Sequence, residues 1–244
     1  MESDHLDERP THLDLFSGIG GFAIAAQWAG FRTIGFCEID PFCCRLLKQH
    51  WPNIPNEGCI TKVRGRHANL LTGGFPCQPV SHAGKRRGQA DHRYLWPEML
   101  RVISEGLPDW VLGENVIGLD GMGLDQCISD LESLGYEVAP PLEIPACSVG
   151  AMHERARFWI VANSNGQRFQ GGVDWMPEDS DSGNINASLL PSLLLAKSQN
   201  DLPEPYNVGA TDGVSDRAHR IKSLGNAIVP QVAYEILREI RKLI

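Results

Sequence analysis

Residues 14–21, DLFSGIGG, decide the fold of this 244-residue chain. The apolar run at 12–16 predicts a strand, and residues 21–30, GFAIAAQWAG, have the composition of a helix. Residues 32–37, RTIGFC, predict a second strand that ends at Glu38. A strand, a glycine-rich turn, a helix and a second strand in this order are typical of a parallel, doubly wound sheet.

The glycine-rich turn and Glu38 together predict a cofactor site. Glycines after a first strand let the backbone approach a ligand closely at a helix N-terminus. An acid at the end of the second strand can hold ribose hydroxyls. Residues 17–21, SGIGG, do not match G-x-G-x-x-G. NAD, a nucleotide and S-adenosylmethionine therefore all fit this pattern, and so does a plain structural turn.

The alternation of strands and helices continues along the chain. We expect further strands at 68–72, 109–113 and 157–162, and further helices at 41–50, 94–105, 121–134 and 231–243. The fold class that this order predicts is α/β, with a mostly parallel sheet.

Residues 163–216 interrupt this order. They are rich in Asn, Ser, Gly, Asp and Pro, and their only basic residues are Arg168 and Lys197 among eight acids. Such a composition is typical of a small insert domain or of a partly disordered segment.

The overall composition excludes several classes of protein. No stretch approaches the ~18 apolar residues that cross a membrane. The polar, acidic N-terminus does not resemble a secretion signal, so we expect the chain in the cytoplasm. The seven cysteines include no C-x-x-C pair, which argues against a disulfide framework and against a zinc site.

The net charge of -8 gives no long-range attraction to a polyanion. Binding to nucleic acid would need local basic patches. Two clusters offer them, although solvated surface charge is the simpler interpretation of each. They are Lys85, Arg86, Arg87 and Arg93 in the first, and Arg217, Arg220 and Lys222 in the second.

Cys77 differs from the other cysteines in its surroundings. It follows the strand expected at 68–72 and lies within residues 72–79, TGGFPCQP, between two prolines. A constrained, glycine-rich loop is a poor place for a packing cysteine and a good place for a presented thiol, which reacts as its thiolate.

Two further groups carry chemistry. Glu114 ends the strand expected at 109–113, where a carboxylic acid of raised pKa could donate a proton to a ring nitrogen. Arg155 and Arg157 are two residues apart, so an extended backbone would point both into one pocket. A helix N-terminal acid and a surface salt-bridge ladder are the structural alternatives.

These segments, taken in order, resemble the motifs of the DNA (cytosine-5)-methyltransferase family, in its bacterial or phage form. The resemblance covers about 1–162 and 212–244. It rests on the DLFSGIGG loop at 14–21, on Glu38, on Pro-Cys-Gln at 76–78, on Glu-Asn-Val at 114–116 and on Gly-Asn at 225–226. It implies a Rossmann-like catalytic domain made of 1–162 and 217–244, with 163–216 as a short target-recognition insert.

The resemblance also implies a reaction. S-adenosylmethionine would supply a methyl group to C5 of a cytosine flipped out of duplex DNA. Cys77 would attack C6, Glu114 would stabilise the charge at N3, and Arg155 and Arg157 would hold the base and its phosphate. No metal is implied, and the expected partner is double-stranded DNA, bound by a monomer.

The remaining site residues follow from the same resemblance. The cofactor site would contain Phe16, Gly18, Ile19, Gly20, Glu38, Ile39, Cys59, Ile60, Pro76, Leu95 and Asn226. DNA contacts would come from Gln78, Ser81, Lys85, Arg86, Arg87, Arg93 and Asn115.

Three positions depart from the family pattern. Cys59 replaces an aspartate that accepts from the adenine amine, and a thiol is a poor substitute for a carboxylate. Ile39 replaces a bulkier residue beside the adenine, and His153 replaces a glutamine. We therefore expect weakened binding of S-adenosylmethionine.

Two alternatives remain at this point. The same cysteine and glutamate could methylate cytosine in an RNA such as tRNA. The chain could also be a catalytically weak DNA-binding relic, as Cys59 and the short acidic insert would allow.

Overall fold

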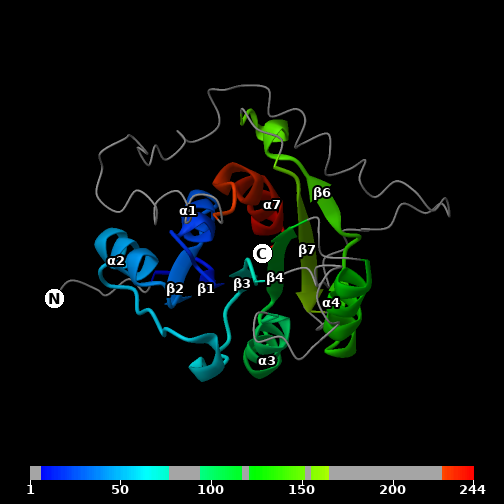
Figure 1. Ribbon diagram of the computed structural model, residues 1–244, viewed down its shortest axis with the longest axis horizontal. Helices are drawn as coiled ribbons and strands as arrows, with labels where there is room; N and C mark the ends of the chain where they lie inside the picture. The colour runs from blue at the N-terminus through cyan, green and yellow to red at the C-terminus, as the bar shows by residue number, and fades with distance from the viewer. Residues whose placement is uncertain (1–6, 77–93, 117–120, 152–154, 165–226) are drawn as a thin grey trace, which may run out of the picture.

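The computed structural model describes residues 7–76, 94–116, 121–151, 155–164 and 227–244 (Figure 1). Several sites predicted from the sequence lie outside these residues. They are Cys77, Gln78, Ser81, Lys85, Arg86, Arg87, Arg93, His153 and Asn226, together with the basic cluster at 217–222 and nearly all of the acidic insert.

A seven-stranded sheet forms the centre of the molecule. Its strands are β1 (Thr11–Leu15), β2 (Arg32–Cys37), β3 (Leu70–Gly73), β4 (Trp110–Val116), β5 (Tyr136–Val138), β6 (Leu142–Ile144) and β7 (Arg157–Ser164). The order is β2-β1-β3-β4-β7-β5, and β6 also pairs with β7.

The sheet is mostly parallel, as predicted. Strands β1 to β4 pair in parallel, whereas β7 is antiparallel to β4, to β5 and to β6. Strands β5 and β6 therefore run in the same direction as β4, and β7 is the one reversed strand among those described.

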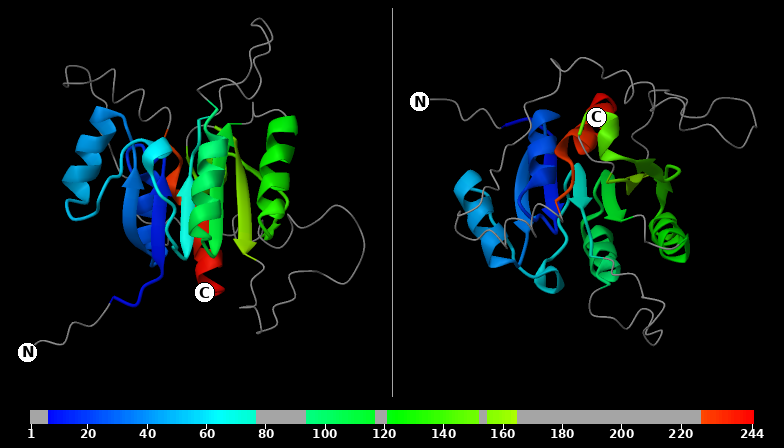
Figure 2. Two further views of the ribbon diagram at one scale, coloured as in Figure 1. Left: turned by 90° about the horizontal axis from the view of Figure 1, so that it is seen from below. Right: turned by 45° about the horizontal axis from the view of Figure 1, so that its top comes forward.

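Helices cover both faces of the sheet, which makes it doubly wound (Figures 1 and 2). On one face lie α1 (Gly21–Trp28) and α7 (Pro230–Lys242); on the other lie α3 (Trp96–Gly106) and α4 (Gly121–Ser133). The helix α2 (Pro41–His50) packs near the β2 edge, and two short 3-10 helices are η1 (Ile60–Lys62) and η3 (Ala146–Val149).

Two apolar cores hold these layers together. Beneath α1 and α7, Phe22 packs edge-on against Trp159, with ring centroids 6.1 Å apart. Beneath α3 and α4, Trp96, Met99 and Ile103 are buried against the sheet. Each large buried side chain contributes roughly 1.5–3 kcal/mol to folding. The rigid sheet can therefore hold functional groups at its edge.

Local chemistry fixes where the helices near the site begin. Asp40 caps α2 by accepting from the N–H groups of Phe42 and Cys43, and Pro41 occupies the first turn. Gly20 precedes α1 with a φ of 88°, and a Cβ there would overlap the ring of Trp51. Only glycine fits that position without strain.

Three local expectations needed correction. Strand β4 continues through Val116, three residues beyond the strand expected at 109–113, although Glu114, Asn115 and Val116 do end the strand as predicted. Arg155 has a φ of 22° and precedes β7, so it does not share an extended segment with Arg157. Strands β5 and β6 were not predicted, because three residues are too few for an alternating pattern to stand out.

None of the described helices is long and apolar enough to span a membrane.

Candidate active site

The register of the parallel strands places the predicted site residues in one row. Leu15 of β1 is aligned with Cys37 of β2 and with Gly73 of β3, and Gly73 is aligned with Gly113 of β4. The residues that directly follow Leu15, Cys37, Gly73 and Gly113 in the chain therefore lie at the same edge of the sheet. These four residues are Phe16, Glu38, Gly74 and Glu114.

A cavity of about 740 Å³ opens at this edge. It lies where the connections from β1 and β3 diverge to opposite sides, which is the usual ligand site of a doubly wound sheet. Most of the predicted site residues that the structure describes line it: Phe16, Gly18, Ile19, Glu38, Ile39, Cys59, Ile60, Pro76, Leu95, Glu114, Asn115, Arg155 and Arg157. Gly20 does not line the cavity and instead shapes the turn before α1.

The carboxylate of Glu38 is held by main-chain N–H groups at one end of the cavity. Oε2 accepts from the N–H of Gly18 at 2.7 Å. Oε1 accepts from those of Ile39 at 2.8 Å and Asp40 at 2.7 Å. A carboxylate has about four acceptor sites and three are used, so about one remains on Oε2 for a ligand hydroxyl. The arrangement fits the predicted binding of ribose.

Beside Glu38, the cavity is lined by the apolar side chain of Ile39. Ile39 is 67% exposed although it lines the cavity, so a flat ring placed against it would cover apolar surface. Nearby, the thiol of Cys59 lies 3.2 Å from Oγ1 of Thr61, a contact that lowers the pKa of the thiol. A thiol here is a much weaker acceptor than the carboxylate that the resemblance leads one to expect at this position.

Glu114 is the buried acid at the other end of the cavity. Burial raises its pKa to about 7, although Arg157 and Arg155 act in the opposite direction. Nε of Arg157 lies 3.0 Å from Oε1 of Glu114. Within the part of the chain that the structure describes, Oε1 nevertheless accepts no aligned hydrogen bond. Glu114 can therefore carry a proton near neutral pH and donate it into the cavity.

The arginine pair reaches the cavity as predicted, but by a different geometry. Arg155 has left-handed backbone and donates from Nη2 to the carbonyl of Ala227 at 2.7 Å. Arg157 begins β7 and donates to the carbonyl of Ala156 at 2.8 Å. Arg155 thereby ties the segment before α7 to the cavity wall.

The loop that leads to Cys77 is anchored where it leaves β3. Nδ2 of Asn115 donates to the carbonyl of Phe75 at 3.0 Å, and the ring of Phe75 packs against Trp96. The N–H of Leu95 donates to the carbonyl of Pro76 at 3.3 Å. The residue before Cys77 is thus held at the cavity wall. Asn115 is buried, and its amide nitrogen donates to this loop. Its contact with DNA stays a prediction.

A buried polar chain below the cavity was not predicted from the sequence. Thr72 donates to Oδ1 of Asp14 at 2.9 Å, and its oxygen lies 2.8 Å from Nε2 of His12. His12 Nδ1 lies 3.0 Å from Oγ1 of Thr33. Because the Thr72 proton goes to Asp14, His12 must donate from Nε2 and accept from Thr33 at Nδ1. Polar residues at alternate positions of the apolar strand β1 were the available signal.

The sequence of the chain matches a known family over most of its length. Residues 11–212 fit the model of the family described as C-5 cytosine-specific DNA methylase. The chain belongs to this family. The cavity at the sheet edge is therefore the candidate functional site of a chain from this family.

Individual methylases of this family are similar to the chain over part of their length. The Type II methyltransferase M.PspPI of Psychrobacter is 43% identical over 159 residues, which are 61% of this chain and 38% of that protein. M.AquIA of Picosynechococcus is 35% identical over 185 residues, 65% of this chain and 73% of that protein. The alignment thus spans less than half of the first relative.

Solved structures share the fold of this chain. S. pombe Dnmt2 has a TM-score of 0.56 at 20% identity, covering 71% of this chain and 62% of that one. A DNMT2 variant from Spodoptera frugiperda has a TM-score of 0.55 at 18% identity, covering 72% and 56%. At such identity the likeness shows the fold alone.

Proposed function

We propose that the chain transfers a methyl group from S-adenosylmethionine to C5 of cytosine in duplex DNA, through a covalent bond between Cys77 and C6. One observation carries this proposal: a single cavity holds Glu38 at one end and Glu114 with Arg155 and Arg157 at the other. Pro76, the residue before Cys77, lines the same cavity.

The cofactor end of the cavity fits S-adenosylmethionine. Glu38 has about one acceptor site left for a ribose hydroxyl, and Ile39 offers apolar surface to an adenine ring. Gly18 and Ile19 line the cavity just before α1, and the open space beside Gly18 permits close approach at the N-terminal end of that helix. When bound, the cofactor supplies an electrophilic methyl group on a sulfonium sulfur.

The catalytic end supplies the groups that make cytosine reactive. C5 of cytosine is too weak a nucleophile to take a methyl group unaided. Addition of the Cys77 thiolate to C6 moves electron density to C5, and Glu114 gives a proton or a hydrogen bond at N3 to stabilise the charge. Once C5 carries the methyl group, loss of its proton expels Cys77.

The arginines and the segments outside the described residues complete the proposal. Arg155 and Arg157 would hold the flipped base and a phosphate, since guanidinium groups suit carbonyl and phosphate oxygens. Residues 163–216 would choose the target sequence. The cluster formed by Lys85, Arg86, Arg87 and Arg93 would contact phosphates.

The biological setting is part of the same proposal. We propose a bacterial or phage enzyme of restriction–modification type that acts as a monomer in the cytoplasm. The Type II methyltransferases that the chain resembles support the restriction–modification setting.

Bisulfite sequencing of DNA from bacteria that express the chain tests the proposal. We expect protected cytosines within one short sequence, and none in cells that express Cys77→Ser. Unprotected DNA with both proteins would overturn the proposal. Methyl transfer measured on duplex DNA and on tRNA separates the RNA alternative, because DNA should be the preferred substrate.

A further inference from the structure

The adenine side of the cavity is built from a segment with little regular structure. Between α2 and β3, residues 51–69 contain only η1 and one isolated bridge, from Asn56 to Phe36. Cys59, Ile60 and Thr61 of this segment line the cavity. Because η1 has just three residues, its own hydrogen bonds cannot fix its position.

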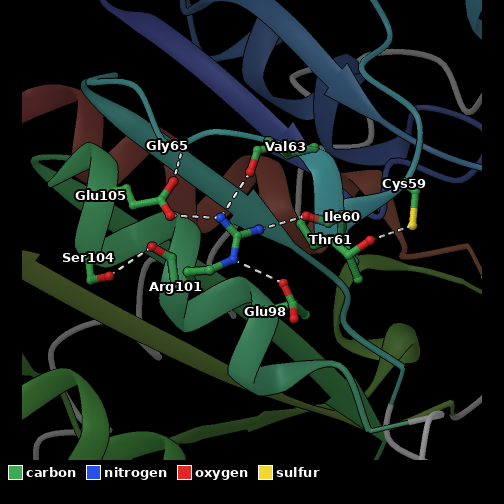
Figure 3. A network of polar contacts seen from close by, with 9 residues as sticks. All are labelled: Cys59, Ile60, Thr61, Val63, Gly65, Glu98, Arg101, Ser104 and Glu105. Carbon is green, nitrogen blue, oxygen red and sulfur yellow. Dashed lines mark hydrogen bonds and ion pairs between the residues drawn. The ribbon is translucent and has the colours of Figure 1, made fainter.

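Arg101 of α3 supplies the missing support (Figure 3). Its Nη2 donates to the carbonyl of Ile60 at 2.8 Å, and its Nη1 donates to the carbonyl of Val63 at 3.0 Å. One guanidinium group therefore holds both ends of η1 against the helix.

Two carboxylates of α3 orient this guanidinium. Oε2 of Glu98 accepts from Nε at 3.0 Å, and Oε1 of Glu105 accepts from Nη1 at 2.8 Å. The three side chains are about one-third exposed, so these ion pairs contribute little to stability by themselves. Their geometric effect is to aim the remaining donors at the segment.

A second contact holds the same segment two residues further along. Oε2 of Glu105 accepts from the N–H of Gly65 at 2.7 Å. A Cβ at Gly65 would lie 2.4 Å from the carbonyl oxygen of Val102, so only glycine permits this approach. The segment is therefore packed backbone to backbone on α3, and its distance from the helix is fixed.

We infer that Arg101 is a positioning residue that fixes the wall formed by Cys59, Ile60 and Thr61, and thereby sets the affinity for S-adenosylmethionine. Arg101 does not line the cavity, so it acts through the wall rather than on the ligand. This inference rests on the proposed function. It assigns a role in cofactor affinity to α3, whose N-cap residue Leu95 lines the same cavity.

The shape of the arginine side chain explains why this residue is used. The two carbonyls lie three residues apart, and the two carboxylates approach from α3. A planar guanidinium group has five N–H donors in a fixed arrangement, whereas an ammonium group has three on one atom. Lysine could satisfy only part of this set.

Calorimetric titration of the full chain with S-adenosylhomocysteine tests the inference. We expect Arg101→Gln to weaken binding about tenfold, as the loss of two hydrogen bonds allows, and Arg101→Lys to give an intermediate value. The matched control is Glu98→Gln, which removes an ion pair of Arg101 but leaves both carbonyl contacts. It should bind within about twofold of the unaltered chain.

Steady-state kinetics distinguishes a misplaced cofactor wall from a general loss of active-site structure. For Arg101→Gln, the KM for S-adenosylmethionine should rise about tenfold while kcat at saturating cofactor stays within about twofold. Equal affinity in a folded Arg101→Gln protein would overturn the inference, and so would a fall in kcat as large as the rise in KM.

A second variant covers the case in which Arg101→Gln does not fold. Gly65→Ala pushes the segment away from α3 without touching Arg101, and it should also weaken binding. If Arg101→Lys and Gly65→Ala both fold and bind with unaltered affinity, the inference is wrong. If the unaltered chain binds no S-adenosylhomocysteine, the proposed function itself fails.

Discussion

Nε of Arg157 lies 3.0 Å from Oε1 of Glu114 across the buried end of the cavity. Glu114 belongs to β4 and Arg157 to β7. These two strands pair in antiparallel fashion and align Val116 with Arg157. Burial raises the pKa of Glu114 to about 7, and the Arg157 charge opposes a larger rise. The pair therefore keeps a carboxyl group that is partly protonated at neutral pH.

Glu114→Gln should retain the shape of the site but lose the proton. Because an amide cannot transfer a proton to N3, we expect kcat to fall by about 10²–10⁴-fold. Affinity for S-adenosylhomocysteine should change little, since Glu114 lies at the opposite end of the cavity from Glu38. Single-turnover methylation and calorimetry measure the two quantities. An unchanged kcat would remove Glu114 from the mechanism.

The buried chain below the cavity predicts how stability depends on pH. Burial raises the pKa of Asp14 from its ordinary value of 3.8 to about 8, and lowers that of His12 from 6.5 to about 3. A raised folded-state pKa stabilises the fold at low pH, and this contribution is lost as pH rises through the folded value. His12 is neutral in both states above about pH 6.5 and adds no slope there.

The free energy of unfolding should therefore fall between pH 6.5 and 8.5. Glu114, whose folded-state pKa is about 7, adds to this fall only near pH 6.5 to 7. Each group adds a slope of at most about 1.4 kcal/mol per pH unit. Asp14→Asn should fall less steeply over this range in urea titrations. A variant with the same slope as the unaltered chain would show that Asp14 is ionised throughout.

Asn115→Ala should affect the nucleophile loop rather than the cofactor end. It leaves the buried carbonyl of Phe75 without its donor, which costs roughly 1–3 kcal/mol of stability. We expect a lower kcat with unchanged affinity for S-adenosylhomocysteine. Chemical denaturation and the kinetic assays for Glu114 measure both effects. Weaker cofactor affinity with normal kcat would contradict this role.

Substitutions at Cys59 and Ile39, which line the cavity near Glu38, should tighten cofactor binding. Cys59→Asp restores an acceptor for the adenine amine, and Ile39→Trp covers more of the ring, so each should tighten binding of S-adenosylhomocysteine about tenfold. The exposed Ile244 lies outside the cavity lining, and Ile244→Trp is the matched control. Unchanged affinity in both wall variants would mean that adenine does not lie there.

The sequence predicted the part of the site that depends on local order. Glycines and acids at or near strand ends placed Glu38 and Glu114 at one sheet edge, because parallel strands align their carboxyl ends. It failed for Arg155, which has a positive φ and whose side chain donates to the carbonyl of Ala227, 72 residues away.

Contacts that link distant elements were also missed. The polar chain of His12, Thr72 and Asp14 crosses strands that are far apart in sequence, and its members look like ordinary strand residues. Arg101 looks like a surface helix residue until α3 is packed against the segment before β3. The alternation of His12 and Asp14 in β1 is the one sequence signal for the polar chain, and Arg101 has none, so the packing is needed to reveal both sets of contacts.

Covalent trapping on a random-sequence pool of duplex DNA that contains 5-fluorocytosine tests the central claim most directly. Fluorine at C5 cannot leave as a proton does, so Cys77 should stay bonded to C6 after methyl transfer. In the presence of S-adenosylmethionine, mass spectrometry should find a covalent protein–DNA species that carries the methyl group, and Cys77→Ser should form none. Absence of this species with the unaltered chain, or its persistence with Cys77→Ser, would contradict the account.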